Sequence, residues 1–163
     1  MSVKVEVKGL KEFQRKIEQV VNDLSGPPMV EGVRDATLFV QSEAKKRAPV
    51  DTGRLRASIM PNVRTLRGGT IQGAVGSNLE YAPYIEMGTG VFADPPRKAH
   101  WPPGSALDTW AKRHGFTSGA QVAFIIGKRG GLRARKFLYN AVAENKDKIA
   151  RLIGQTVGRI VEK

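Results

Sequence analysis

Apolar and polar residues alternate near the start of the chain and then change to a helical period. Valines alternate with charged residues over residues 3–7, and this spacing of two predicts a half-buried strand that ends at Gly9. Apolar residues then recur every three or four positions over residues 10–24, which predicts a helix with one apolar stripe. The Ser-Gly-Pro-Pro run at 25–28 predicts the end of that helix.

A second helical pattern covers about residues 30–47. Its apolar stripe is built from small and β-branched residues such as Val33, Ala36 and Val40, and small residues would allow a sheet to approach closely. Three cations at 45–47 fall in the last turn, where they offset the negative end of the helix dipole. That local role explains the cations without a ligand.

A β-hairpin is predicted next. Pro49 disfavours helix at the residue before it, and Gly53 permits backbone angles that other residues avoid. Evenly spaced Ile and Val residues over 58–67 and 70–77 predict two strands, with the two glycines at 68–69 as their turn. The pattern therefore predicts a β-centre flanked by helices.

The segment after the hairpin contains a short helical pattern and then many turn residues. A short helix is predicted over residues 79–87, followed by Gly88 and Gly90. Four prolines within residues 92–104 preclude a continuous helix or a central strand, so this stretch is predicted to be an exposed loop or arm that orders against a neighbour. Trp101 either contacts a partner from this loop or folds back onto the core, and the sequence leaves both open.

Helical patterns return in the last third of the chain. Short helices are predicted near 107–113 and 120–126, and a long one over about 134–161. The predicted fold class is α+β: a small, mainly antiparallel sheet with packed helices and a long C-terminal helix. With 163 residues and no break in composition, a single domain over 1–163 is expected.

Positive charge is the strongest global feature. The chain has 27 Lys and Arg and 15 Asp and Glu, so its formal net charge is 27 − 15 = +12. Five cations lie within residues 128–136, with no acidic residue until Glu144. Such a chain favours an acidic partner, which charge alone leaves open as nucleic acid, an anionic membrane or an acidic protein face; a solvated basic surface is the remaining alternative.

Several functional classes are disfavoured by composition. The chain has no cysteine, which excludes disulfides, thiolate metal sites and a cysteine nucleophile. No apolar run approaches the roughly 18 residues that span a bilayer, and the start of the chain lacks the pattern of a cleaved signal, so no membrane partner is expected.

The sequence contains only weak signals for a catalytic or cofactor site. The Asp-Thr-Gly at 51–53 occurs once and follows a helix end, whereas aspartic proteases bring two such loops together, so Asp51 is interpreted as a turn or capping acceptor. His100 and His114 lack metal-ligand spacing, and the Gly-Lys-Arg-Gly-Gly run at 127–131 is not a phosphate-binding loop. We therefore expect no catalytic residue, cofactor or metal.

Two motifs carry a resemblance to a known family. A Pro-x-Asp-Thr-Gly-x-Leu-x-x-Ser-Ile segment follows a long helix, and after the hairpin comes Tyr-Ala-x-Tyr-Ile-Glu-x-Gly-Thr-Gly. In this order the motifs resemble those of neck or tail-completion proteins of long-tailed bacteriophages. The matching residues are Pro49, Asp51, Thr52, Gly53, Leu55, Ser58, Ile59, Tyr81, Ala82, Tyr84, Ile85, Glu86, Gly88, Thr89 and Gly90.

The resemblance implies a structural virion protein at the capsid–tail junction, assembled in the host cytoplasm. It would act in head–tail joining or tail completion as a homo-oligomeric ring of six copies. Head–tail connector and tail-terminator or tail-tube proteins would be its partners, with non-specific contact to packaged DNA possible. The alternative from the basic composition is a DNA-binding accessory protein without sequence preference.

Two groups of residues are the candidate site residues. The first forms structural turns: Pro49, Asp51, Thr52, Gly53, Gly88, Thr89 and Gly90. The second is expected to bind partners through charge and one aromatic ring: Arg97, Lys98, Trp101, Arg133, Arg135 and Lys136.

Overall fold

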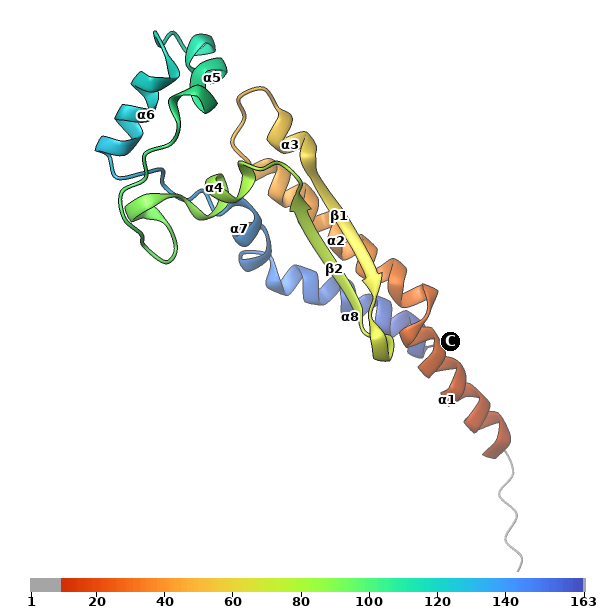
Figure 1. The fold of residues 1–163 in the computed structure, drawn as a ribbon. Helices are drawn as coiled ribbons and strands as arrows, with labels where there is room; N and C mark the ends of the chain where they lie inside the picture. The colour runs from red at the N-terminus through yellow and green to blue at the C-terminus, as the bar shows by residue number, and fades with distance from the viewer. Residues whose placement is uncertain (1–9, 163) are drawn as a thin grey trace, which may run out of the picture. The chain divides into compact units, whose positions relative to one another are not determined.

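The computed structural model describes residues 10–162 as helices joined by short loops, with one β-hairpin (Figure 1). The strand predicted over residues 3–7 lies outside the described residues. The chain divides into two compact units. The described part of unit 1 consists of residues 10–43, 60–75 and 144–162, and unit 2 consists of residues 44–59 and 76–143. The expectation of a single domain over 1–163 stays a prediction.

Helices α1 (Leu10–Ser25) and α2 (Pro27–Arg47) follow one another with only Gly26 between them. The prediction that the Ser-Gly-Pro-Pro run ends the first helix is confirmed, but the second helix begins at Pro27 and not near residue 30, so Pro27 and Pro28 form the first turn of α2. Proline is accepted there because the first N–H groups of a helix have no partner within it. The same residues that exclude continuation of one helix thus begin the next.

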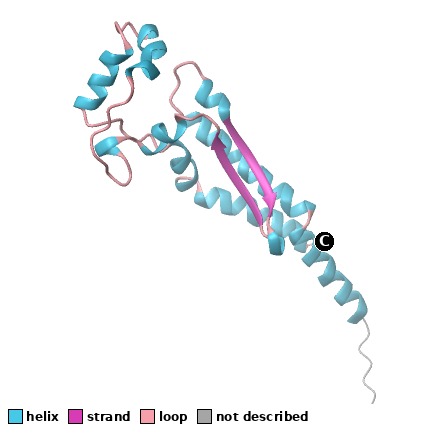
Figure 2. Ribbon diagram, in the orientation of Figure 1, coloured by secondary structure: helices cyan, strands magenta, loops and turns pink. Residues whose placement is uncertain are grey.

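The hairpin consists of β1 (Ile59–Thr65) and β2 (Ile71–Ser77), which form a two-stranded antiparallel sheet (Figure 2). Its turn closes where the N–H of Leu66 donates to the carbonyl of Thr70 at 2.7 Å. Gly68 and Gly69 have φ of 81° and 79°, a left-handed conformation that favours glycine. The predicted hairpin and its glycine turn are confirmed.

Unit 1 packs β2 and α8 (Lys146–Val161) close to α2. Val33, Ala36 and Val40 of α2 are buried, as the small-residue stripe predicted. Gly73 of β2 lies against Thr37, and Gly32 of α2 lies against Thr156 of α8; a Cβ at either glycine would overlap these side chains. The close packing therefore depends on the two glycines.

Unit 2 contains five short α-helices besides the end of α2. They are α3 (Arg54–Ser58), α4 (Ala82–Met87), α5 (Asp108–Arg113), α6 (Gly119–Lys128) and α7 (Phe137–Ala143). Ala111, Val122 and Ile126 are buried at the α5–α6 contact, with partly buried apolar residues around them. The side chains of Ile59 and Phe137 are fully buried in the same unit.

The last helix is shorter than predicted. The apolar spacing predicted one helix over about 134–161, but α7 ends at Ala143 and α8 begins at Lys146. Asn145 between them has φ −120° and ψ 17°, outside the helical range, and asparagine favours such conformations because its amide competes for backbone hydrogen bonds. The α+β fold with a long C-terminal helix is confirmed, with α8 as that helix.

None of the helices within residues 10–162 combines the length and the apolar character needed to cross a bilayer.

Candidate partner-binding surface

The second motif, at 81–90, holds the start of α7, directly after the basic segment 128–136, through Glu86. One carboxylate oxygen of Glu86 accepts a hydrogen bond from the N–H of Leu138 at 2.9 Å, and the other accepts from the N–H of Tyr139 at 2.8 Å. Both donors belong to the first turn of α7, whose N–H groups have no partner within the helix. Glu86 therefore caps α7 with a negative charge at the positive end of the helix dipole.

The same motif is joined to the basic segment by Thr89. The N–H of Thr89 donates to the carbonyl of Leu132 at 2.9 Å, and the N–H of Leu132 donates to the Thr89 hydroxyl at 2.9 Å. Thr89 is only 6% exposed. These two bonds fix the position of residue 132 against residue 89.

Glycines allow the two segments to approach backbone to backbone. Gly88 has φ 73° and Gly90 has φ 61°, a left-handed conformation that favours glycine. A Cβ at Gly88 would come within 2.8 Å of the Leu132 carbonyl oxygen and of the Ala134 nitrogen. A Cβ at Gly90 would overlap the carbonyl of Gly130. Any side chain at Gly88 or Gly90 would therefore push the basic segment away.

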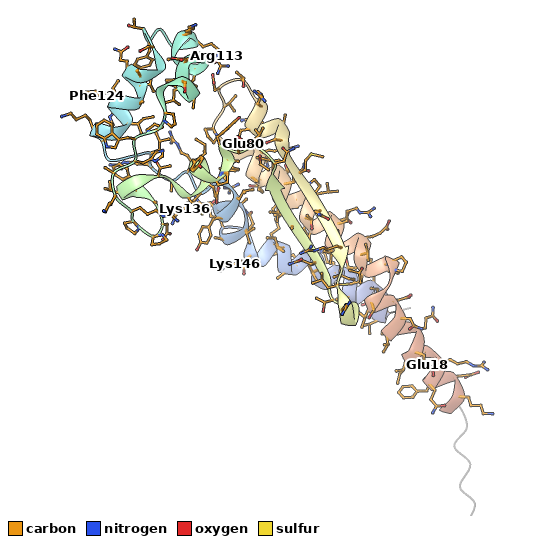
Figure 3. The ribbon with its side chains drawn as sticks, in the orientation of Figure 1. Glu18, Glu80, Arg113, Phe124, Lys136 and Lys146 are labelled. Atoms are coloured by element: carbon orange, nitrogen blue, oxygen red, sulfur yellow. The ribbon has the colours of Figure 1, made fainter. Side chains whose placement is uncertain are left out.

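Two of the predicted partner-binding cations contact the 92–104 loop. Lys136, labelled in Figure 3, forms an ion pair with Asp94 at 3.0 Å between Nζ and Oδ2. The guanidinium of Arg133 lies over the Phe92 ring, 5.2 Å from its centre. Arg135 is exposed, and its N–H donates to the carbonyl of Ile85 at 2.8 Å. The structure thus brings these cations together on one segment of unit 2.

The 92–104 segment is a loop folded onto its own unit, which differs from an arm that orders only against a neighbour. The N–H of Arg97 donates to the Gly90 carbonyl at 2.9 Å, and that of His100 donates to the Gly130 carbonyl at 3.3 Å. Arg97 and Lys98 are exposed. Their charged ends are therefore presented from an anchored backbone.

Trp101 combines the two alternatives left open by the sequence. Its ring lies on Gly127 of α6, where any Cβ would overlap it, yet the residue is 53% exposed. The Phe124 ring meets it edge-on, with the ring centres 6.0 Å apart, and is itself 55% exposed. The Nζ atom of Lys128 lies 5.7 Å from the centre of the Phe124 ring. We name Trp101, Phe124 and Lys128 the aromatic patch.

The first motif, at 49–59, forms internal contacts of unit 2. The Asp51 carboxylate accepts from the Arg113 guanidinium at 2.8 Å and lies 3.5 Å from Nε2 of His114. It does not cap α3, whose N-cap residue is Gly53 with φ 80° and no side-chain cap. The capping role considered for Asp51 is therefore replaced by an ion pair with α5. Pro49 and Thr52 lie on either side of Asp51, in the connection between α2 and α3.

The two histidines contact aromatic rings. His100 stacks on Tyr84 with the ring centres 6.4 Å apart, and His114 stacks on Trp110 at 3.9 Å. Within residues 10–162, no three His, Asp or Glu side chains lie together in an arrangement that could hold a metal ion.

Charge is concentrated in unit 2. Residues 97–143 contain nine Lys and Arg and one acidic residue, so their net charge is 9 − 1 = +8 of the total of +12.

The sequence predicted the cations but missed Glu86 as the cap of α7, and it missed Phe124 and Lys128 as neighbours of Trp101. Only the Glu-x-Gly-Thr-Gly motif carried a signal for the first, and nothing local carried one for the second.

Residues 10–88 match the family model of HK97-gp10-like proteins, described as "Bacteriophage HK97-gp10, putative tail-component". The resemblance predicted from the two motifs is thereby confirmed over this segment, which includes the first motif and most of the second. The match supports a structural role as a phage tail component. No curated protein and no solved structure matches the chain significantly.

Proposed function

We propose that this chain is a subunit of a ring at the junction between phage capsid and tail, where it completes the tail or joins it to the head. The ring contains identical copies, six in the arrangement that the resemblance implies. Connector proteins on one side and tail-terminator or tail-tube proteins on the other are its partners. The proposal gives the chain no catalytic role, and it places assembly in the host cytoplasm and the finished ring in the virion.

The observation that carries this proposal is the family match over residues 10–88. The chemistry of unit 2 supports it, because a structural adaptor needs surfaces held in fixed positions. Glu86 and Thr89, both in the second motif, anchor the segment that carries Arg133, Arg135 and Lys136. A rigid basic segment suits contact with an acidic face of an adjoining protein, since preorganisation lowers the entropic cost of binding.

The charge of unit 2 also favours a second candidate, a DNA-binding accessory protein. Nine cations against one acidic residue over 97–143 would bind phosphates, and each phosphate neutralised steepens the log–log salt dependence by about 0.9 on duplex DNA. A conduit for DNA, however, should let the duplex slide. We therefore propose that Arg133, Arg135 and Lys136 face acidic protein surfaces and not the channel.

The test is to replace the gene in its phage with charge-reversed variants and count joined particles by electron microscopy. Lys136 and Arg133 contact the 92–104 loop, so their reversal would also disturb that loop. The sharper variant combines Arg129→Glu with Arg135→Glu, at two exposed side chains. We expect separate capsids and tails. Arg151→Glu with Arg56→Glu changes the charge equally at exposed positions elsewhere and should leave joining intact.

Three results would decide against the proposal or its details. Infectious particles from the Arg129/Arg135 variant would show that these cations only solvate the surface. Normal joining with altered DNA ejection would place them in the channel. Tight, salt-sensitive binding of the purified protein to random duplex DNA, without any oligomer, would favour the accessory-protein function.

A further inference from the structure

The outer edge of β2 is open to a further strand. Within residues 10–162 the hairpin is a sheet of two strands, so β1 and β2 each have a strand partner on one side only. The N–H of Leu66 donates to the carbonyl of Thr70, and along antiparallel strands the direction of such groups alternates. The N–H and carbonyl groups of residues 71, 73 and 75 therefore point away from β1. An edge of this kind is a template for pairing with another chain.

The outer edge of β1 is protected, whereas that of β2 is not. By the same alternation, the backbone nitrogen of Pro61 points away from β2, and proline has no N–H to offer to a further strand. β2 contains neither a proline nor a charged side chain over Ile71–Ser77, although these are the usual devices that block pairing at a sheet edge. One edge of the hairpin is therefore available to a third strand.

The two faces of β2 differ in polarity. Gly73 lies against α2, and Ile71 and Val75, two positions away on either side, share its face and are half-buried. Gln72 and Ala74 are exposed on the opposite face. A strand that continues this sheet therefore needs apolar residues on one face and polar residues on the other.

Residues 3–7 have the alternation that this edge requires. They precede the part of the chain that the structure describes, and their sequence Val-Lys-Val-Glu-Val predicts a half-buried strand. Beside β2, the valines would continue the apolar face of Ile71 and Val75. Lys4 and Glu6 would then continue the exposed face.

The same copy cannot supply this strand to its own β2. Ser25, the last residue of α1, lies at the hairpin turn, because a Cβ on Gly69 would be 3.4 Å from its Oγ. From there α1 runs away from the strands (Figure 1), and its 16 residues span about 24 Å. Residues 3–9 span about the same distance when fully extended. Even if they turned back along α1, they would therefore end at the hairpin turn.

We propose that residues 3–7 of one copy add to the outer edge of β2 in a neighbouring copy, as the third strand of its sheet. Backbone hydrogen bonds to residues 71, 73 and 75 hold this strand, and burial of its valines toward α2 selects the face that turns inward. Because the donated strand and the accepting edge are different surfaces, the contact is head-to-tail, and it forms a ring when its rotation closes. The inference rests on the proposed function, since it supplies the subunit contact of the proposed ring.

Engineered disulfides test this pairing, because the chain has no cysteine of its own. The donor variants Lys4→Cys and Glu6→Cys are each mixed with the acceptor variants Gln72→Cys and Ala74→Cys and oxidised. We expect a mixed disulfide in at least one of these mixtures. Neighbouring strands place Cα atoms about 5 Å apart, within the roughly 7 Å limit for a disulfide. A disulfide between a donor and an acceptor variant can only join two copies.

Asn62→Cys is the matched control. Asn62 is exposed like Ala74 and lies opposite it on β1, by the register that Leu66 and Thr70 set. A strand on the outer edge of β2 would be two strands away from Asn62, about 10 Å, which is too far for a disulfide. We therefore expect no mixed disulfide between Asn62→Cys and either donor variant.

Val5→Lys tests the apolar face of the donated strand at a position before α1. Sedimentation velocity should show oligomers for the wild-type chain and association weaker by about tenfold or more for Val5→Lys, because a lysine replaces a valine on the buried face. Glu6→Gln raises the net charge by the same amount on the exposed face and should associate like wild type. Circular dichroism checks that both variants fold.

The outcomes separate this contact from the proposed function. The contact is wrong if the wild-type chain is monomeric, if no mixture gives a mixed disulfide, if Asn62→Cys reacts as well as Ala74→Cys, or if Val5→Lys associates like wild type. Faster linkage of Ala74→Cys to itself than to either donor variant would show pairing of two β2 edges and also overturn it. If the pairing is found but phage lacking the chain still join capsids to tails, the contact stands and the function at the junction fails. Rings that form without the mixed disulfide leave that function standing and overturn this contact.

Discussion

Thr89 and Leu132 exchange two hydrogen bonds, each 2.9 Å long, across 43 positions of the sequence. One joins the two backbones, and the other uses the Thr89 hydroxyl as acceptor for the Leu132 N–H. Thr89 is buried, so an unsatisfied N–H at Leu132 would have little access to water. This pair fixes the middle of the basic segment 128–136 against the second motif.

Replacing Thr89 by valine should therefore destabilise the protein. Valine keeps the shape of threonine but removes the acceptor, and a buried donor left without a partner costs about 1–3 kcal/mol. Urea unfolding measures the change. Thr89→Ser keeps the hydroxyl and should lose clearly less. Equal stability of Thr89→Val and wild type would contradict the role of this bond.

Capping of α7 by Glu86 gives a second prediction. Glu86→Ala leaves the N–H groups of Leu138 and Tyr139 without their carboxylate acceptor, and the loss of a cap costs roughly 0.5–2 kcal/mol. Glu86→Gln retains an acceptor oxygen and should lose less. Chemical denaturation followed by circular dichroism distinguishes the two. The capping role is refuted if both substitutions leave the denaturation midpoint where it was.

Gly88 and Gly53 differ in what surrounds them, although both have positive φ. Around Gly53 nothing lies within 4 Å of an added Cβ, so Gly53→Ala should cost only the backbone strain, about 1–2 kcal/mol. Gly88→Ala adds overlap with backbone atoms of Phe92, Leu132 and Ala134, which rotation of a side chain cannot relieve. We expect a distinctly larger loss in melting temperature for Gly88→Ala, and similar losses for both would contradict the close approach.

Two helical glycines should respond with opposite signs to the same substitution. Gly154 in α8 is exposed, and nothing lies within 4 Å of an added Cβ, so Gly154→Ala should stabilise the protein by about 0.5–1 kcal/mol through helix propensity. Gly32 in α2 lies against Thr156, and Gly32→Ala should destabilise it through overpacking. Calorimetry of the two variants tests the packing of unit 1, and stabilisation by Gly32→Ala would contradict it.

Local features of the fold could be predicted from the sequence because their causes are local. The hairpin follows from residues of period two around Gly68 and Gly69, whose positive φ only a few residue types adopt. The stripe of Val33, Ala36 and Val40 follows from helical spacing. The start of α2 at Pro27 was misassigned because proline excludes the interior of a helix but not its first turn.

The break between α7 and α8 could not be predicted from apolar spacing. The spacing continues through Asn145, and only the backbone angles of this residue reveal that the helix stops. The contacts of the candidate site were harder to predict from the sequence than the helix break, because they join distant positions. Glu86 is 52 residues from Leu138, and Asp51 is 62 residues from Arg113. Residue types at those positions indicated turns and charges, but nothing in the sequence indicated which would meet.

The central claim is that the chain forms a ring between capsid and tail, and cryo-electron microscopy of the virion tests it most directly. The account predicts a ring of density at the capsid–tail junction into which units 1 and 2 fit, with the segment 128–136 against acidic residues of an adjoining protein. Virions that lack the chain, or that hold it away from this junction, would contradict the account.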